Sequence, residues 1–150
     1  MKIGALTAIL STLVACAWIE PPPPRNNPRD VIVDEVVAQV DRPYRYQGAD
    51  PAGFDDSGLV QYVFKRSGVE LPHSTEGQRA QGNRIAFSQV RRGDLLFYEL
   101  KDNPYRELHV GIYIGRSRMV HIRENGRVQI EVINVPYWQR RLLGAVSHLP

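Results

Sequence analysis

The chain has 150 residues, of which 43% are hydrophobic and 23% charged, and its formal net charge is +3. This length suits one folded domain and is too short for two. The positive charges are scattered, without a run of five or more, so nucleic-acid binding is not indicated. The one cysteine is Cys16, so residues 17–150 can form no disulfide, no cysteine-ligated metal site and no thiol nucleophile.

The first 16 residues have the pattern of an export signal. Lys2 precedes an apolar run, residues 3–15, which is shorter than the roughly 20 residues that a membrane-spanning helix needs. The run ends in Leu13-Val14-Ala15-Cys16, which resembles the bacterial lipoprotein signal, where small residues precede a cysteine that is acylated and becomes the mature N-terminus. We therefore predict a signal peptide at residues 1–15 and lipidation of Cys16. A short buried helix that ends in a chance cysteine is the alternative.

A proline-rich linker is predicted at residues 16–29. It contains Pro21-Pro22-Pro23-Pro24, and consecutive prolines favour an extended polyproline conformation of about 3.1 Å per residue. We expect this segment to act as a stalk that holds the domain away from the membrane. Ala17 follows the cysteine, where lipoproteins retained in the inner membrane often have aspartate. The resemblance therefore implies an outer-membrane location that faces the periplasm.

Three helices are predicted in the first half of a domain spanning residues 30–150. Asp30 can cap a helix through Val40, whose apolar face is formed by Val33, Val36, Val37 and Val40. A turn-rich stretch follows at residues 42–53. A second helix begins at Asp55 or Asp56 and ends near Gly68, with a buried stripe of Leu59, Val60, Val63 and Phe64. The third helix is polar and is capped by Ser74 or Thr75.

The second half of the domain changes to the period of β-strands. An apolar run at residues 93–98 predicts a buried strand, and residues 109–114 and 119–123 alternate as half-buried strands do. Asn125-Gly126 predicts a hairpin turn into a strand with Val128, Ile130 and Val132 on one face. Helices followed by antiparallel strands are typical of an α+β domain.

Several blocks of residues occur in a characteristic order. They are Tyr44-Arg45-Tyr46-Gln47-Gly48, residues 53–61 (GFDDSGLVQ), residues 92–97 (RGDLLF), residues 109–115 with His121, and residues 136–145. Together they resemble the signature of the NlpC family of cell-wall (murein) cysteine peptidases over residues 33–146. The resemblance implies a papain-like fold, with N-terminal helices packed on an antiparallel sheet of about five strands. It also implies a hydrolase for γ-D-glutamyl to diamino-acid bonds in peptidoglycan stem peptides, without a metal or other cofactor.

The resemblance assigns roles to four residues. Asp56 stands at the position of the nucleophilic cysteine, His109 at that of the base, and His121 at that of the residue that orients the base. Tyr46 corresponds to a tyrosine on the oxyanion side of the site. In such sites the helix dipole favours a thiolate at a helix N-terminus, and a nearby histidine takes the thiol proton. His73 and His148 lie outside the blocks, and we interpret them as a helix-start residue and a tail residue.

The strand pattern predicts independently that the two central histidines lie together. A three-residue loop at Gly115-Arg116-Ser117 pairs Gly111 with His121 and places His109 and His121 on one face as diagonal neighbours. Gly111 then leaves the space between them open. A two- or four-residue loop would place the two histidines on opposite faces.

Aspartate at residue 56 leaves three hypotheses. A carboxylate is a poor nucleophile towards an amide, and its acyl-enzyme would be an anhydride, so we favour an impaired enzyme that acts as a peptidoglycan-binding or regulatory lipoprotein. Alternatively, Asp55 or Asp56 activates water together with His109, and the protein is an active cell-wall hydrolase. The third hypothesis is a metal site, because Asp56, His109 and His121 are the residue types of a two-histidine, one-carboxylate triad. Catalytic triad geometry argues against it, because it arranges these groups in series.

Overall fold

A computed structural model of the chain describes residues 27–100 and 107–150. The predicted signal peptide, Cys16 and residues 16–26 of the predicted linker lie outside the described residues. In the described part of the chain, no helix has the length and apolar character needed to cross a membrane.

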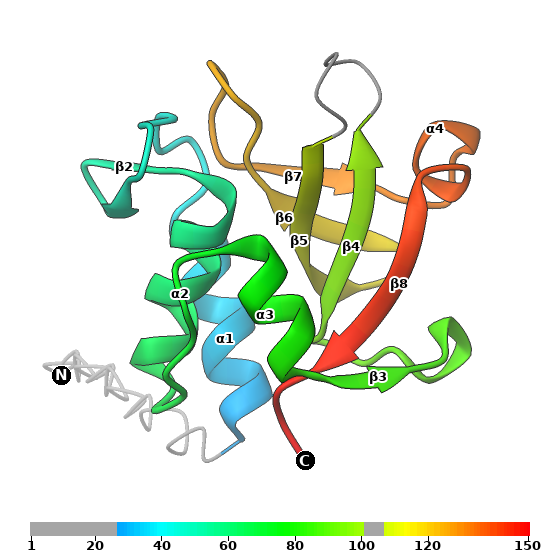
Figure 1. Cartoon of the computed structure of the whole chain (residues 1–150). Helices are drawn as coiled ribbons and strands as arrows, with labels where there is room; N and C mark the ends of the chain where they lie inside the picture. Colours follow the sequence, from blue (N-terminus) through cyan, green and yellow to red (C-terminus); the bar gives the residue numbers. More distant parts are fainter. Residues whose placement is uncertain (1–26, 101–106) are drawn as a thin grey trace, which may run out of the picture.

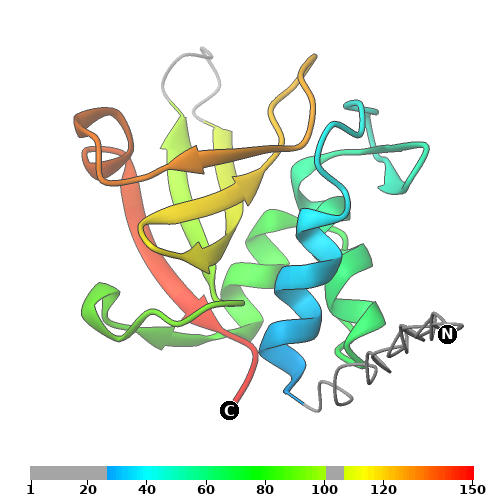
Figure 2. The same cartoon turned by 180° about the vertical axis from the view of Figure 1, so that it is seen from behind.

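The described residues form a layer of helices packed on a sheet (Figure 1). The helices α1 (Pro28–Val37), α2 (Asp56–Arg66) and α3 (Thr75–Gln81) lie together on one side of the sheet in both views (Figures 1 and 2). The short helix α4 (Pro136–Gln139) packs on the other side, and a 3-10 turn, η1 (Phe87–Gln89), precedes the central strands.

The main sheet has six strands in the order β3-β8-β4-β5-β6-β7, and every neighbouring pair is antiparallel. The strands are β3 (Asn83–Ile85), β4 (Leu95–Leu100), β5 (Glu107–Gly115), β6 (Arg118–His121), β7 (Gln129–Val132) and β8 (Leu142–Ser147). A separate antiparallel ribbon, β1 (Ala49–Asp50) and β2 (Gly53–Phe54), precedes α2. The predicted α+β class is confirmed, with six strands in the sheet where about five were expected.

Helix α1 begins and ends earlier than predicted. Its N-cap is Asn27, whose side chain accepts the Arg29 amide at 3.0 Å, so the prediction that Asp30 caps the helix was wrong. Pro28 occupies the first turn, where its fixed φ suits a helix start. The helix ends at Val37, which is 39% exposed. Its buried apolar face is formed by Ile32, Val33 and Val36, because these side chains meet the core beneath α2.

Arg29 fastens α1 to the sheet. Its Nη1 donates to Asp94 Oδ1 at 2.8 Å and to the Arg92 carbonyl at 2.9 Å, and its Nη2 donates to Ser147 Oγ at 3.1 Å. The side chain is nearly buried, and a buried guanidinium needs such partners. Residues 28 and 29 are therefore part of the folded domain and not of a free linker.

Two apolar clusters lie on opposite faces of the sheet. Leu95 and Phe97 of β4 face the cluster beneath the helices, whereas Leu96 and Tyr98 face the cluster beneath Trp138 of α4. Because β4 is buried on both faces, its sequence is apolar without alternation, as a central strand requires.

Candidate active site

The site is built on the first turn of α2. Asp55 is extended and caps the helix, because its Oδ1 accepts the Gly58 amide at 2.6 Å. The preceding chain passes so closely that a Cβ on Gly58 would overlap the Gly48 carbonyl oxygen. Glycine at 58 therefore allows the chain at Gly48 to lie against the helix start. Of the two aspartates, Asp55 is the cap and Asp56 is the first helical residue.

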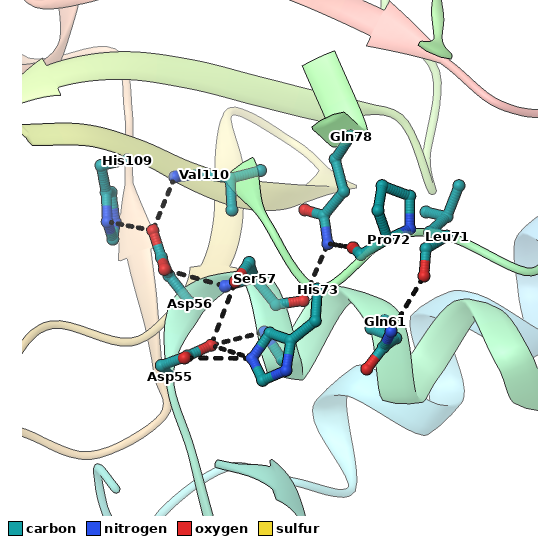
Figure 3. A network of polar contacts seen from close by, with 11 residues as sticks. Asp55, Asp56, Ser57, Gln61, Leu71, Pro72, His73, Gln78, His109 and Val110 are labelled. Carbon is teal, nitrogen blue, oxygen red and sulfur yellow. Dashed lines mark hydrogen bonds and ion pairs between the residues drawn. The ribbon is translucent and has the colours of Figure 1, made fainter. Parts of the chain in front are cut away.

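The carboxylate of Asp56 reaches from α2 to β5 (Figure 3). Its Oδ1 accepts the Ser57 amide at 2.8 Å, while Oδ2 lies 3.3 Å from His109 Nδ1 and 3.4 Å from the Val110 amide nitrogen. Backbone amides at a helix N-terminus favour a negative charge at this position. The structure thus brings together Asp56 and His109, the pair expected from the sequence.

The hairpin between β5 and β6 differs from the predicted loop. Arg116 and Ser117 both have a φ of 52°, as in a two-residue hairpin turn, and the register shifts between Tyr113 and Gly115. The prediction of a three-residue loop was therefore wrong. One extra residue in β5 offsets the shorter turn, and the pair Ile112–Val120 continues with Gly111 opposite His121.

His109 and His121 consequently share one face, as predicted. His109 Nε2 lies 2.9 Å from His121 Nδ1, and their rings are nearly perpendicular with centroids 5.1 Å apart. Only 2% of His109 and 1% of His121 is exposed. A Cβ on Gly111 would lie 2.6 Å from Met119 Sδ, so Met119 fills the space that we expected to be open.

Two residues of β7 extend this line of side chains. His121 Nε2 lies 2.7 Å from Glu131 Oε2 and 3.2 Å from Gln129 Nε2. The register pairs His121 with Gln129 and Met119 with Glu131. The sequence reasoning missed both residues, although the hairpin at Asn125-Gly126 carries the signal. If Val128, Ile130 and Val132 share one face of a strand, Gln129 and Glu131 point to the other face.

Trp138 covers the histidine pair. Its ring stacks on His109 at 6.2 Å between centroids and meets His121 edge-on at 5.2 Å. Burial lowers the pKa of His121, although its hydrogen bond to Glu131 acts in the opposite direction. The same hydrogen bond lowers the pKa of the Glu131 carboxyl. A neutral His121 beside an ionised Glu131 is therefore the state that these surroundings favour.

A cleft of about 490 Å³ reaches Asp56 and His109 from the surface. It is lined by Tyr44, Tyr46, Asp55, Asp56, Leu100, Glu107, His109, Ile122, Arg123 and Glu124. The lining has four carboxylates and one guanidinium, that of Arg123. Arg123 Nη2 donates to the Tyr137 hydroxyl at 2.9 Å. Burial and then the charge of Asp56 raise the pKa of Glu107, and burial followed by Glu124 raises the pKa of Tyr44. Tyr46 is 78% exposed and forms part of the rim.

The metal-site hypothesis finds no support in this arrangement. Asp56 and His121 contact opposite ring nitrogens of His109, so the three groups lie in series and do not converge on one point. Among residues 27–100 and 107–150, no group of three or more His, Cys, Asp or Glu side chains is arranged to hold a metal ion.

The remaining histidines make contacts that the sequence did not indicate. His73 Nε2 lies 2.9 Å from Asp55 Oδ1 and 3.0 Å from Oδ2, which joins the segment before α3 to the cap of α2 (Figure 3). Gln78 of α3 donates to the Ser57 carbonyl at 2.8 Å and supports the same turn. His148 is half-buried, and its Nε2 donates to the Gln78 carbonyl at 2.8 Å. Both histidines are therefore held by the fold.

Residues 41–147 match the NlpC/P60 family. Among curated proteins, the chain is 39% identical over 99 residues to the murein DD-endopeptidase MepS/murein LD-carboxypeptidase of Escherichia coli, covering 65% of this chain and 51% of that protein. The chain spans between about a fifth and a half of the length of the curated relatives that it matches.

Solved structures share the fold. A lipoprotein-like NLP/P60 protein from Staphylococcus aureus has a TM-score of 0.73 at 30% identity, covering 83% of this chain and 42% of that chain. RipD from Mycobacterium tuberculosis has a TM-score of 0.67 over 82% of this chain and 98% of its own. Its identity of 24% makes that likeness one of fold alone. Because the family match covers well over half of its residues, the chain belongs to the NlpC/P60 family.

Proposed function

We propose that the protein is a peptidoglycan-binding envelope lipoprotein that does not hydrolyse stem peptides. The observation that carries this proposal is the carboxylate of Asp56, which lies at the N-terminus of α2 and 3.3 Å from His109 Nδ1. In this reading Asp56 stands where the family's chemistry needs a thiol. The sole cysteine of the chain is Cys16, outside the described residues.

The contact with Asp56 also opposes a role for His109 as a base. An ionised carboxylate only accepts hydrogen bonds, so a hydrogen bond across this contact needs a proton on His109 Nδ1. A ring nitrogen that already holds a proton cannot take one from a nucleophile. Loss of one member of a nucleophilic triad lowers turnover by about 10⁴-fold or more. Hydrolysis by the family's covalent route is therefore not expected.

The cleft remains available for a ligand. It keeps tyrosines on its rim and polar groups around Asp56, a combination that suits peptide binding. RipD is described as a non-catalytic NlpC/p60 domain protein adapted to a peptidoglycan-binding function, which gives a precedent on the same fold. The match to the murein endopeptidase MepS supports peptidoglycan stem peptides as the ligand class.

The second candidate is an active hydrolase in which the aspartate–histidine pair activates water. It is favoured by the intact line from His109 through His121 to Glu131 and by the access of the cleft to Asp56. In this reading the product is a stem peptide cut between γ-D-glutamate and the diamino acid. This mechanism requires an unprotonated His109 Nδ1, which the carboxylate opposes.

Purified peptidoglycan separates the two functions. Wild-type protein and its His109→Ala variant are incubated with sacculi, and the pellet is analysed for bound protein and the muropeptides by mass spectrometry. We expect co-sedimentation without new peptide ends above the His109→Ala background. New ends produced by wild type alone would establish the hydrolase and overturn the proposal.

The cleft is tested by a pair of exposed aromatic residues. Tyr46→Ala removes a ring from the rim and is expected to weaken co-sedimentation several-fold, because stacked or buried aromatic side chains often dominate binding energy. Phe87→Ala is the matched control, since Phe87 is 53% exposed and lies outside the cleft. Equal losses in the two variants would mean that the protein binds peptidoglycan through another surface.

A further inference from the structure

Four side chains from four elements form a continuous line of polar contacts. Asp56 of α2 meets His109 of β5 at 3.3 Å, His109 meets His121 of β6 at 2.9 Å, and His121 meets Glu131 of β7 at 2.7 Å. Each contact uses a different ring nitrogen, so each histidine bridges two neighbours. The line therefore has a carboxylate at each end and two imidazoles between them.

The end at Glu131 dictates the direction of the hydrogen bonds. A neutral imidazole has one N–H and one bare nitrogen, and a carboxylate can only accept. The 2.7 Å contact thus needs the proton on His121 Nε2, which leaves His121 Nδ1 as an acceptor. The proton between the histidines then belongs to His109 Nε2. His109 Nδ1, which faces Asp56, is left as the basic nitrogen.

We propose that Glu131 is a positioning residue, which accepts from His121 Nε2 and thereby directs the basic nitrogen of His109 towards residue 56. The role goes beyond peptidoglycan binding, since it concerns protons inside the domain. It does not depend on that function, because it is measured on the protein alone.

The residues around the two histidines favour a single direction for the hydrogen bonds along the line. Trp138 and Met119 cover the pair, and both histidines are almost fully buried, so water does not compete for the ring nitrogens. Gln129 Nε2 lies 3.2 Å from His121 Nε2 and donates to Glu131 Oε2 at 3.4 Å. A flipped amide presents its acceptor oxygen to His121 instead, so Gln129 imposes no direction. Burial favours neutral His121, and a neutral imidazole carries its proton on one ring nitrogen only.

Asp56 opposes Glu131 at the other end of the line. Two neutral imidazoles carry two protons, whereas three contacts with ionised ends need three. Satisfying all three contacts at once takes a third proton, on His109 Nδ1 between the ring and Asp56. Without Glu131, the hydrogen bonds can run in the opposite direction. His121 Nδ1 then donates to His109 Nε2, and His109 Nδ1 donates to Asp56.

Nitrogen NMR of the imidazole rings reads these protons directly, because protonated and bare ring nitrogens have different chemical shifts. In ¹⁵N-labelled wild type near neutral pH, we expect His121 as the Nε2–H form and a proton on His109 Nε2. His121 in the Nδ1–H form in wild type would overturn the proposal.

Variants of Glu131 test its control of the direction. Glu131→Gln retains an acceptor oxygen and is expected to keep His121 in the Nε2–H form. Glu131→Lys places a donor opposite Nε2 and is expected to convert His121 to the Nδ1–H form. Glu124→Lys is the matched control, since it makes the same charge change in the cleft at a residue that does not line the histidine chain.

A further variant keeps the test decisive if Glu131→Lys does not fold. Glu131→Met removes the acceptor without adding a charge, and Asp56 then determines the direction. We expect a large Nδ1–H population of His121 in this variant. A folded Glu131→Met protein with His121 wholly in the Nε2–H form would show that Glu131 does not set the direction.

Discussion

At residue 56, a carboxylate and a thiol make opposite demands on the same imidazole nitrogen. Beside a thiol, His109 Nδ1 accepts a proton and generates the thiolate. Beside Asp56, at 3.3 Å, the same nitrogen can form a hydrogen bond only by donating. The geometry of the pair is thus compatible with the family's chemistry, while an ionised carboxylate offers His109 no proton to take. This difference of one proton underlies the proposal of a binding protein.

Glu107 in the cleft gives a prediction of pH-dependent stability. Burial and the charge of Asp56 raise the pKa of Glu107 in the folded protein. Folded protein then binds more protons than unfolded protein just above the ordinary glutamate pKa of about 4.3, so this group's contribution falls as pH rises through that window. Glu107→Gln should therefore raise the melting temperature at pH 7, and the gain should vanish near pH 4.

The size of the Glu107 effect is limited by solvent. The side chain is exposed at the cleft, so the gain should stay below about 1 kcal/mol. Glu70→Gln is the control, because Glu70 is exposed and does not line the cleft. A Glu107→Gln protein that is less stable than wild type at pH 7, as followed by calorimetry, would contradict this assignment of charge repulsion.

At the scale of elements, local patterns predicted what depends on one segment. The stripe from Leu59 to Phe64 and the Ser74 cap are both observed, because helix faces and caps involve residues three or four apart. The β5–β6 turn was predicted wrongly, since Gly115-Arg116-Ser117 permits several turn lengths. The prediction that His109 and His121 share one face was nevertheless right, because a shift of register by one residue would move the buried side chains of the strand to the other face.

Gly58 tests how tightly α2 meets the preceding turn. Alanine in a helix is ordinarily about 1 kcal/mol more favourable than glycine. A Cβ at residue 58 would overlap the Gly48 carbonyl oxygen, which is backbone and cannot rotate away. We expect Gly58→Ala to destabilise the domain by roughly 3 kcal/mol in denaturant unfolding.

The control for Gly58→Ala is a substitution elsewhere on the same helix. Lys65 is exposed, and Lys65→Ala should change the unfolding free energy by less than about 0.5 kcal/mol. If Gly58→Ala is as stable as wild type, the 45–48 turn adapts, and the positioning of Asp56 does not depend on this close approach.

At the scale of the whole molecule, the features that escaped prediction depend on residues far apart in the chain. β8 inserts between β3 and β4, so that Ala145 pairs with Leu96 and with Ile85. Arg29 joins α1 to Asp94 and Ser147. No local period encodes such partners, because they are fixed only when the sheet closes over its core. Glu131 belongs to the same class, because its contact with His121 joins two strands, and the sequence reasoning missed it.

The predicted membrane anchoring depends on residues before the described domain. Cys16→Ser removes the only thiol that lipid modification can use. We expect the variant to remain unprocessed or unlipidated and to leave the membrane fraction, whereas Ser11→Ala, in the same segment, should fractionate as wild type does. Unchanged membrane association of Cys16→Ser, followed by immunoblotting, would refute the lipoprotein assignment.

Asp56→Cys asks whether the rest of the catalytic apparatus persists. The substitution places a thiol at the start of α2, next to His109 and within reach of the Val110 amide. The helix N-terminus and an imidazole both lower a thiol pKa, and with Glu131 in place His109 Nδ1 is free to take the thiol proton. We expect measurable cleavage of stem peptides between γ-D-glutamate and the diamino acid, detected by mass spectrometry.

The expected activity is partial, because catalytic groups need placement within about 0.5 Å, and one substitution does not adjust the surrounding side chains. Adding His109→Ala to Asp56→Cys should abolish it by removing the base. Asp55→Cys is the positional control, since a thiol at the cap points to His73 and not to His109. A folded Asp56→Cys protein without activity would mean that the cleft differs from a peptidase beyond its nucleophile. The binding function would then be the stronger conclusion, because more than one residue would have to change before this domain could catalyse the reaction.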